Sequence, residues 1–356
     1  MITQEDIARM VGVSQGVISA VLNDSNAIRV SKDTREQILR LVDETGYQPN
    51  RLAKALRTGK SGVIGILFRG GYSQIWMAKL FEVVKEVKAR GYRPLIYDMV
   101  LMSDSEESAS VWLLRERVEG VMLLGVSGLV TDPRLSRAVL GKVPVVSMDG
   151  FLDVPIPQVQ SDREQGFYIL AKHLLELGHQ RLGILRLEKW ANYEHPHTEG
   201  MLKGVSRALA EFGKSEPIMI RLPRVDRDIE DPYIDGKAHM QELLKRKRED
   251  WPDAVICSND AWAIGAISAC AEQGIRVPED IAVVGFQDEV QAAYVVPPLT
   301  TVAPPLKTLA ARGVERLVEL IGQGRPVPEE QEILNMPCSL VVRESCGVKL
   351  KQNKGK

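Results

Sequence analysis

The chain has 356 residues, more than one ordinary domain holds and enough for two or three. Lys and Arg number 46 against 47 Asp and Glu, so the net charge of −1 excludes a uniformly basic nucleic-acid-binding protein, while 44% hydrophobic and 26% charged residues are typical of soluble globular proteins. The absence of any run of about 18 apolar residues, and of a signal peptide in the opening MITQEDIARM, predicts a cytoplasmic protein without a membrane span.

Three short helices are predicted in residues 1–48. The first begins after Thr3 and ends at Gly12, because threonine caps helix starts and glycine adopts the left-handed conformation at helix ends. The second begins after Ser14, and the third runs over residues 31–45. Two helices joined by a tight turn and braced by a third are typical of a helix-turn-helix DNA-binding domain.

The second helix has an apolar face and a face of short side chains. The short side chains would let the helix enter a DNA major groove, with Gln15 reading adenine and Ala20 touching a thymine methyl. A small helical domain that binds another protein remains the alternative. The predicted DNA-binding residues, in the helices and the segment that follows, are Thr3, Ser14, Gln15, Gly16, Ser19, Ala20, Asn23, Arg29, Ser31, Thr34, Tyr47, Asn50, Arg51, Ala53, Leu56 and Arg57.

Residues 49–60, PNRLAKALRTGK, carry four bases and no acid. Asn50 can cap a short helix on which Leu56 protrudes among basic side chains, an arrangement that suits a wedge in the DNA minor groove. A solvated linker is the alternative. The nearby TGKS is not a phosphate-binding loop, because Lys54 occupies the position where that motif needs glycine.

From residue 61 onward, short apolar runs alternate with amphipathic helices. Such alternation predicts parallel sheets with helices on both faces, and about 280 residues are too many for one such core. A two-lobed α/β body is therefore expected over residues 61–346, followed by a basic tail at 347–356. The predicted strands are Val63–Phe68, Pro94–Asp98, Gly120–Leu124, Pro144–Met148, Arg181–Leu185, Ile218–Leu222, Asp253–Cys257 and Ile281–Phe286, and the helices include Ile75–Ala89, Arg163–Leu177 and Ala261–Gln273.

Several stretches together resemble the LacI/GalR (lactose-repressor) family of bacterial transcription regulators. They are IARMVGVSQGVISAVLN, VSKDTREQILRLVDETGYQPNRLAKALRTGKSGVIGIL, LLELGHQRLGIL, RVPEDIAVVGF and PPLTTV, and they extend almost to LVVRESC. The resemblance implies a hinge helix with Leu56 as the minor-groove wedge and a homodimer that binds a pseudo-palindromic DNA operator as a repressor. It also implies a body like periplasmic sugar-binding proteins, whose chain crosses between lobes near residues 160, 290 and 325. The lobes would hold about 61–160 with 291–323, and 161–290 with 324–346.

A small-molecule effector is expected between the lobes, at the carboxyl ends of the strands. The family resemblance places Met201 where members usually carry arginine and Gln287 where they usually carry aspartate. These departures predict an unusual effector, or regulation by a protein partner or by nothing. The candidate effector-binding residues are Tyr72, Trp76, Ser127, Asp149, Trp190, Met201, Asn259 and Gln287.

Other classes of function are disfavoured. The first strand leads into RGGYSQIW rather than G-x-G-x-x-G, and no catalytic triad is indicated, so we expect no enzyme and no cofactor. A periplasmic solute-binding protein conflicts with the helix-turn-helix pattern. His195 and His197 form a weak metal motif, and the cysteines have no ligand spacing, so no metal is expected.

Overall fold

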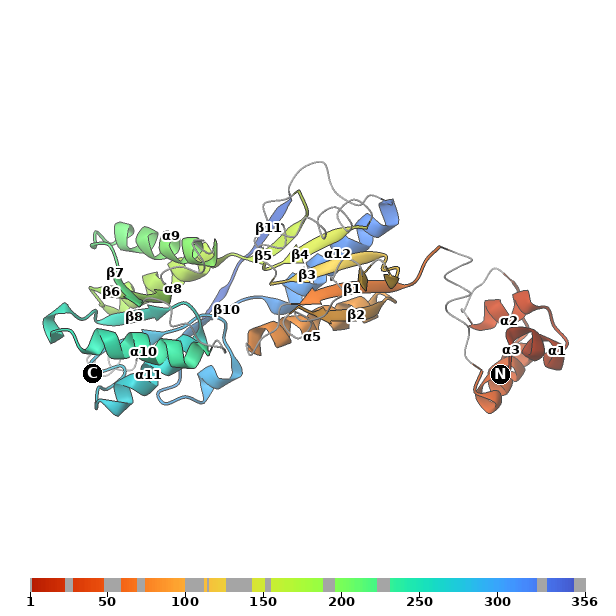
Figure 1. The fold of residues 1–356 in the computed structure, drawn as a ribbon, viewed down its shortest axis with the longest axis horizontal. Helices are drawn as coiled ribbons and strands as arrows, with labels where there is room; N and C mark the ends of the chain where they lie inside the picture. The colour runs from red at the N-terminus through yellow and green to blue at the C-terminus, as the bar shows by residue number, and fades with distance from the viewer. Residues whose placement is uncertain are drawn as a thin grey trace. The chain divides into compact units, whose positions relative to one another are not determined.

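The computed structural model describes residues 2–22, 28–47, 59–68, 74–99, 112–113, 115–125, 143–150, 155–187, 196–222, 231–324 and 332–348. The chain divides into two compact units, Met1–Ser61 and Gly62–Lys356 (Figure 1).

The first unit contains three helices, α1 (Gln4–Val11), α2 (Gln15–Leu22) and α3 (Lys32–Thr45). A capping box between Thr3 and Asp6 starts α1, and Gly12 ends it with a φ of 75°. Ile7, Ile18 and Ile38 contribute one fully buried side chain from each helix to a shared core. The three predicted helices of the head are therefore confirmed.

The second unit begins with a parallel sheet that α5 (Gln74–Ala89) and α12 (Leu306–Gln323) cover on one face (Figure 1). Its order is β11-β5-β4-β3-β1-β2. Residues such as Leu113 and Val118 pack against the other face. The strands are β1 (Val63–Phe68), β2 (Arg93–Asp98), β3 (Gly120–Leu124), β4 (Val145–Met148), β5 (Gln158–Ser161) and β11 (Ile333–Met336).

A second parallel sheet, in the order β7-β6-β8-β9, forms the other lobe of the same unit. Two pairs of helices cover it: α8 (Arg163–Leu177) and α9 (Pro196–Glu211) contribute to one core, while α10 (Pro232–Leu244) and α11 (Asp260–Glu272) contribute to another. Short 3₁₀ turns, η2 and η3, lie at Arg248–Asp250 and Val290–Ala293. The strands are β6 (Leu182–Leu187), β7 (Ile218–Leu222), β8 (Ala254–Cys257) and β9 (Ala282–Val284).

The chain passes between the two sheets three times. The first passage follows β5 at Asp162, close to the expected residue 160. The second lies between β10 (Thr301–Ala303) and α12, rather than near 290, because Ala292 and Leu299 still belong to the second lobe's core. The third lies between β11 and β12 (Ser339–Val341), rather than near 325, because β11 still pairs with β5.

All eight predicted strands are present, with ends that differ by at most two residues. The two-lobed architecture with parallel sheets is thus confirmed. The prediction did not include β5, β10, β11 or β12. None of the helices in the described ranges is long and apolar enough to cross a membrane.

Candidate nucleic-acid interface and ligand site

The start of α2 presents the exposed surface of the first unit. Ser14, Gln15 and Gly16 are exposed, while Ile18 is buried behind them. Gln4 Nε2 donates a hydrogen bond to the Gln15 carbonyl at 3.0 Å, which fixes the entry into the helix and leaves the Gln15 side chain outward. Ala20 is only 6% exposed, so the prediction that its methyl group stands on the outer, accessible face of α2 is wrong.

Several other predicted DNA contacts have structural roles in the head. The Thr3 hydroxyl donates to Asp6 Oδ2 at 2.6 Å and the Thr3 N–H donates to the same oxygen at 2.9 Å, and these two hydrogen bonds lower the pKa of Asp6. The same hydroxyl accepts from the Asp6 N–H and so caps α1. Ser31 Oγ caps α3 by accepting from the Thr34 N–H at 3.1 Å. Tyr47 packs against the head core, where burial raises the pKa of its hydroxyl.

Only two of the remaining predicted DNA-binding residues lie in the described part of the head. Arg29 is exposed and Ser19 is half-buried. Those outside the described residues are Asn23, Asn50, Arg51, Ala53, Leu56 and Arg57. The hinge helix and its wedge therefore stay predictions.

In the second unit, a buried ion pair lies at the carboxyl end of β4. Lys79 Nζ, from α5, is 2.7 Å from Asp149 Oδ2, and both side chains are 5% exposed. Asp149 also accepts from the Ser161 N–H at 2.6 Å and from its hydroxyl at 3.1 Å. Burial would raise the pKa of Asp149, but attraction to Lys79 and these hydrogen bonds together lower it.

Trp76, on α5, lies beside this buried ion pair. Its ring covers Gly125 so closely that a β-carbon there would lie 2.5 Å from the ring, and the ring centroid is 3.9 Å from Lys79 Nζ. Lys79 therefore contacts both Asp149 and Trp76. The sequence predicted Asp149 and Trp76 as site residues but did not predict Lys79.

Arg163, the first residue of α8, adds a second cation at these strand ends. Its guanidinium carbon lies 4.6 Å from the ring centroid of Phe286 and 5.3 Å from that of Phe167. Nη2 donates to the Ser258 carbonyl, just after β8, at 3.4 Å. Burial lowers the pKa of Arg163 to about 10 even though Asp149 attracts the charge.

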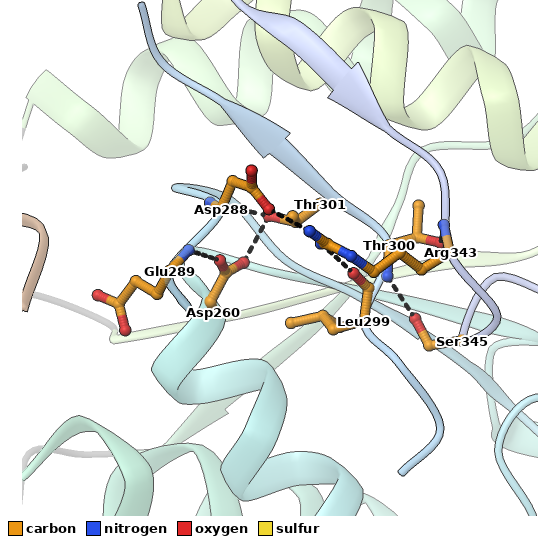
Figure 2. A network of polar contacts seen from close by, with 8 residues as sticks. All are labelled: Asp260, Asp288, Glu289, Leu299, Thr300, Thr301, Arg343 and Ser345. Atoms are coloured by element: carbon orange, nitrogen blue, oxygen red, sulfur yellow. Dashed lines mark hydrogen bonds and ion pairs between the residues drawn. The ribbon is translucent and has the colours of Figure 1, made fainter. Parts of the chain in front are cut away.

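A third polar group joins α11 to the β9–β10 connection (Figure 2). Asp260 accepts from Thr301 Oγ1 at 2.5 Å and from the Glu289 N–H at 2.7 Å. Burial raises the pKa of Asp260 to about 7 although both hydrogen bonds oppose the shift. Arg343 pairs with Asp288 at 2.7 Å and so ties the C-terminal segment to the same connection.

The other predicted effector residues are distributed differently from expectation. Met201 is 1% exposed in the core formed by α8, α9 and the second sheet, so the prediction that it forms a wall of the ligand site is wrong. Asn259 caps α11 by accepting from the Trp262 N–H, and Gln287 has a φ of 120° and donates its N–H to the Val302 carbonyl. Tyr72, Ser127 and Trp190 lie outside the described residues.

The metal motif cannot be located in the described part of the chain. His195 lies outside those residues, as does the side chain of His197. The residues that sequence reasoning missed are Lys79, Ser161 and Arg163. Only a prediction of β5 would have placed Ser161 and Arg163 at a sheet edge.

Two family descriptions match the two units. Residues 3–50 match "Bacterial regulatory proteins, lacI family", and residues 171–346 match "Periplasmic binding protein-like domain". A curated relative, the "HTH-type transcriptional repressor PurR" of Photobacterium profundum, is 28% identical over 97% of this chain and 98% of its own. The "Ribose operon repressor" of Haemophilus influenzae is also 28% identical, over the same shares of the two chains.

Solved structures show the same architecture. The lac repressor dimer bound to operator and the anti-inducer ONPF has a TM-score of 0.77 and 25% identity, and the match covers 97% of this chain and 99% of that chain. The complex of the transcriptional regulator CelR with cellobiose has a TM-score of 0.66 and 26% identity, over 97% and 100%.

Proposed function

This chain belongs to the lacI family of bacterial regulatory proteins, and from that membership we propose that it is a DNA-binding transcriptional repressor whose body binds a regulatory ligand. The observation that carries the proposal is a three-helix head with an exposed α2 start on the same chain as a two-sheet body. The repressors to which it is similar match 97% of this chain, so the similarity includes both the head and the body. The function requires no catalysis, and a regulator of this kind works in the cytoplasm, where bacterial DNA is.

The head supplies the means of reading DNA. Ser14 at the start of α2 can donate to a phosphate, which fixes the helix on the duplex. Gln15, next along the helix, has an outward amide whose paired donor and acceptor match the major-groove edge of adenine. Gly16 adds no side chain, and so the helix backbone can approach the bases closely.

The body supplies surfaces for a second copy of the chain. Met77 and Phe81 on α5 are 54% and 67% exposed, and Tyr294 and Val296 beyond η3 are 80% and 84% exposed. Large apolar side chains exposed to this degree are candidates for an interface. A two-fold dimer would place two heads on half-sites about one helical turn apart, as the relative titled a lac repressor dimer bound to operator implies.

The carboxyl ends of the two sheets supply the ligand site. Ligands of open parallel sheets bind at these ends, and here they carry Trp76, Lys79, Asp149 and Arg163. A regulator without a small-molecule ligand is the second candidate, which the Lys79–Asp149 pair favours because each charge already has a partner within the protein.

Binding to DNA selected from a random library tests the proposal. Gln15→Ala should weaken binding to the selected sequence at least about fivefold, since a good bidentate base contact is worth about 1–3 kcal/mol, while weak binding to unrelated DNA remains. Gln37→Ala, which removes an exposed glutamine from α3 of the same unit, is the matched control and should bind as wild type does. Failure of the wild-type protein to enrich any sequence would overturn the proposal.

A further inference from the structure

The buried ammonium of Lys79 lies at the carboxyl end of β4, where ligands of open parallel sheets bind. The Asp149 carboxylate is 2.7 Å from this ammonium, and the centroid of the Trp76 ring is 3.9 Å from it. A carboxylate and an aromatic face are the groups with which proteins recognise the ammonium group of a ligand. Here the protein's own lysine supplies the ammonium.

The backbone around the pair is shaped for this contact. Trp76 and Lys79 are three residues apart on α5, so their side chains lie on one face of the helix. Gly125, directly after β3, leaves the space that the Trp76 ring fills, since a β-carbon there would lie 2.5 Å from the ring. Asp149 has a φ of 48°, in the left-handed region, and such conformations in residues other than glycine are concentrated at ligand clamps and switches.

The Asp149 carboxylate has little acceptor capacity left for a ligand. It accepts from the Ser161 N–H at 2.6 Å and from the Ser161 hydroxyl at 3.1 Å as well as from Lys79, and a carboxylate offers about four acceptor positions. Although burial alone would raise the pKa of Asp149, these contacts lower it, so the group is held in its charged form. A neutral hydroxyl of a ligand would gain little by displacing a charged donor, because charge-assisted hydrogen bonds are the stronger ones.

Stability alone does not account for a lysine at this position. Replacement of a buried ion pair by apolar residues of similar volume is often neutral or stabilising, and the next α5 residues in the core of this sheet, Leu80 and Val83, are apolar. A buried pair can instead fix one arrangement of the elements that carry it. The elements here are α5, the end of β4 and the end of β5, where Ser161 directly precedes the first passage between the sheets.

We propose that Lys79 is a built-in occupant of the ligand site: its ammonium takes the position between Asp149 and Trp76 that the cation of a ligand would take, and it holds the body in the DNA-binding state without a small molecule. The inference rests on the proposed function, in the form of a repressor without a small-molecule ligand. Because a permanently filled site leaves the body in one state, such a repressor must bind DNA in that state. Removal of the ammonium should therefore weaken DNA binding.

Lys79→Ala combined with n-propylammonium tests the inference, because this ion has the atoms that the substitution removes. The variant should bind the selected DNA sequence at least about fivefold more weakly than wild type, the lower end of typical coupling between two sites. n-Propylammonium chloride should restore most of this loss and raise the unfolding temperature of the variant by several degrees, because the ion binds only the folded state. Potassium chloride at equal ionic strength should restore neither, and nor should n-propanol, which has the same carbon chain without the charge.

Two variants are the matched controls. Lys79→Met also removes the charge, but its side chain fills the space, so it should weaken DNA binding without any response to n-propylammonium. Lys85→Ala removes a lysine from the same helix that is 57% exposed and 3.6 Å from Glu82, and it should bind DNA as wild type does with or without the ion. If Lys79→Ala folds poorly, the effect of n-propylammonium on its unfolding temperature still tests the occupancy, and Lys79→Met tests the loss of DNA binding.

Two results would overturn the inference. One is wild-type affinity of the folded Lys79 variants for the selected DNA sequence, and the other is an equal response of Lys79→Ala and Lys79→Met to n-propylammonium. Both results leave the proposed function intact, since the wild-type protein still binds its selected sequence. Absence of sequence-specific binding by the wild type instead refutes the proposed function.

Discussion

Replacement of Lys79 by methionine would leave Asp149 charged and buried. Two unit charges 2.7 Å apart attract by about 6 kcal/mol at an effective dielectric constant of 20, but desolvation offsets much of this. Removal of one partner from a buried pair costs about 3–5 kcal/mol. Asp149 keeps two hydrogen bonds from Ser161 and the attraction of Arg163, so we expect Lys79→Met to lower the free energy of unfolding by about 3 kcal/mol, at the lower end of that range.

Urea unfolding followed by tryptophan fluorescence measures this loss in the body alone, because all five tryptophans lie beyond residue 61. Lys85→Met is the control on the same helix: Lys85 is 57% exposed and 3.6 Å from Glu82, and such surface pairs contribute less than about 1 kcal/mol. The double variant Lys79→Met with Asp149→Asn removes both charges and should recover about 2 kcal/mol of the loss. A loss below about 1 kcal/mol in Lys79→Met would show that the pair is solvated and refute the reasoning.

The loss should also depend on pH. In the wild type the pKa of Asp149 is lowered, so its contribution to stability is complete above the ordinary value of 3.8 and disappears only as pH falls through the lower folded value. Without Lys79, burial would raise that pKa, and protonation at mildly acidic pH would relieve the buried charge. The difference between wild type and Lys79→Met should therefore shrink from pH 7 to pH 4.5, and a constant difference would contradict this assignment.

Three further perturbations follow from individual contacts. Gly204→Ala should lower the free energy of unfolding by about 3 kcal/mol, because its β-carbon would lie 2.3 Å from the Glu164 carbonyl oxygen; Gly322→Ala in α12, where nothing lies within 4 Å, should be neutral or stabilising in the same urea titration. Burial raises the pKa of Asp260 to about 7, so the wild type should lose stability from this group as pH rises from 4 to 7, and Asp260→Asn should remove that decline in unfolding curves at pH 5 and 8. Phe81→Asp should weaken self-association in sedimentation velocity without changing the unfolding midpoint of the monomer, and an unchanged dimer would exclude this face as an interface.

The sequence predicts those parts of the fold in which local pattern and tertiary environment agree. The strands β1 and β3 contain no polar side chain, β7 contains only Arg221, and the predicted ends of all three match the structure. The strand β5 has the sequence QVQS, which reads as a polar loop, yet Gln158 and Ser161 are 3% and 6% exposed. Pairing with β4 and β11 buries these side chains, and no local pattern reports such pairing.

The head shows the same division. Helix ends at Thr3, Gly12 and Gly46 depend on adjacent residues and are correctly predicted. The burial of Ala20 was missed, because a helical face can be assigned from sequence only to within about one residue in a helix of eight, and alanine needs little space to be buried. The correction narrows the candidate reading surface to the first turn of α2, at Ser14, Gln15 and Gly16.

A single departure from the family pattern, at Met201, did not predict which charged side chains lie at the carboxyl ends of the strands. The departure at Met201 predicted a less polar wall, but Met201 packs from α9 into the core of the second lobe. The cations at the strand ends come instead from α5 and α8, as Lys79 and Arg163. From the sequence alone, Arg163 looks like an ordinary first-turn residue after the cap at Asp162, yet its guanidinium carbon lies 4.6 Å from the ring centroid of Phe286, far along the chain. Because that contact exists only in the folded body, no local sequence pattern predicts where the Arg163 guanidinium lies.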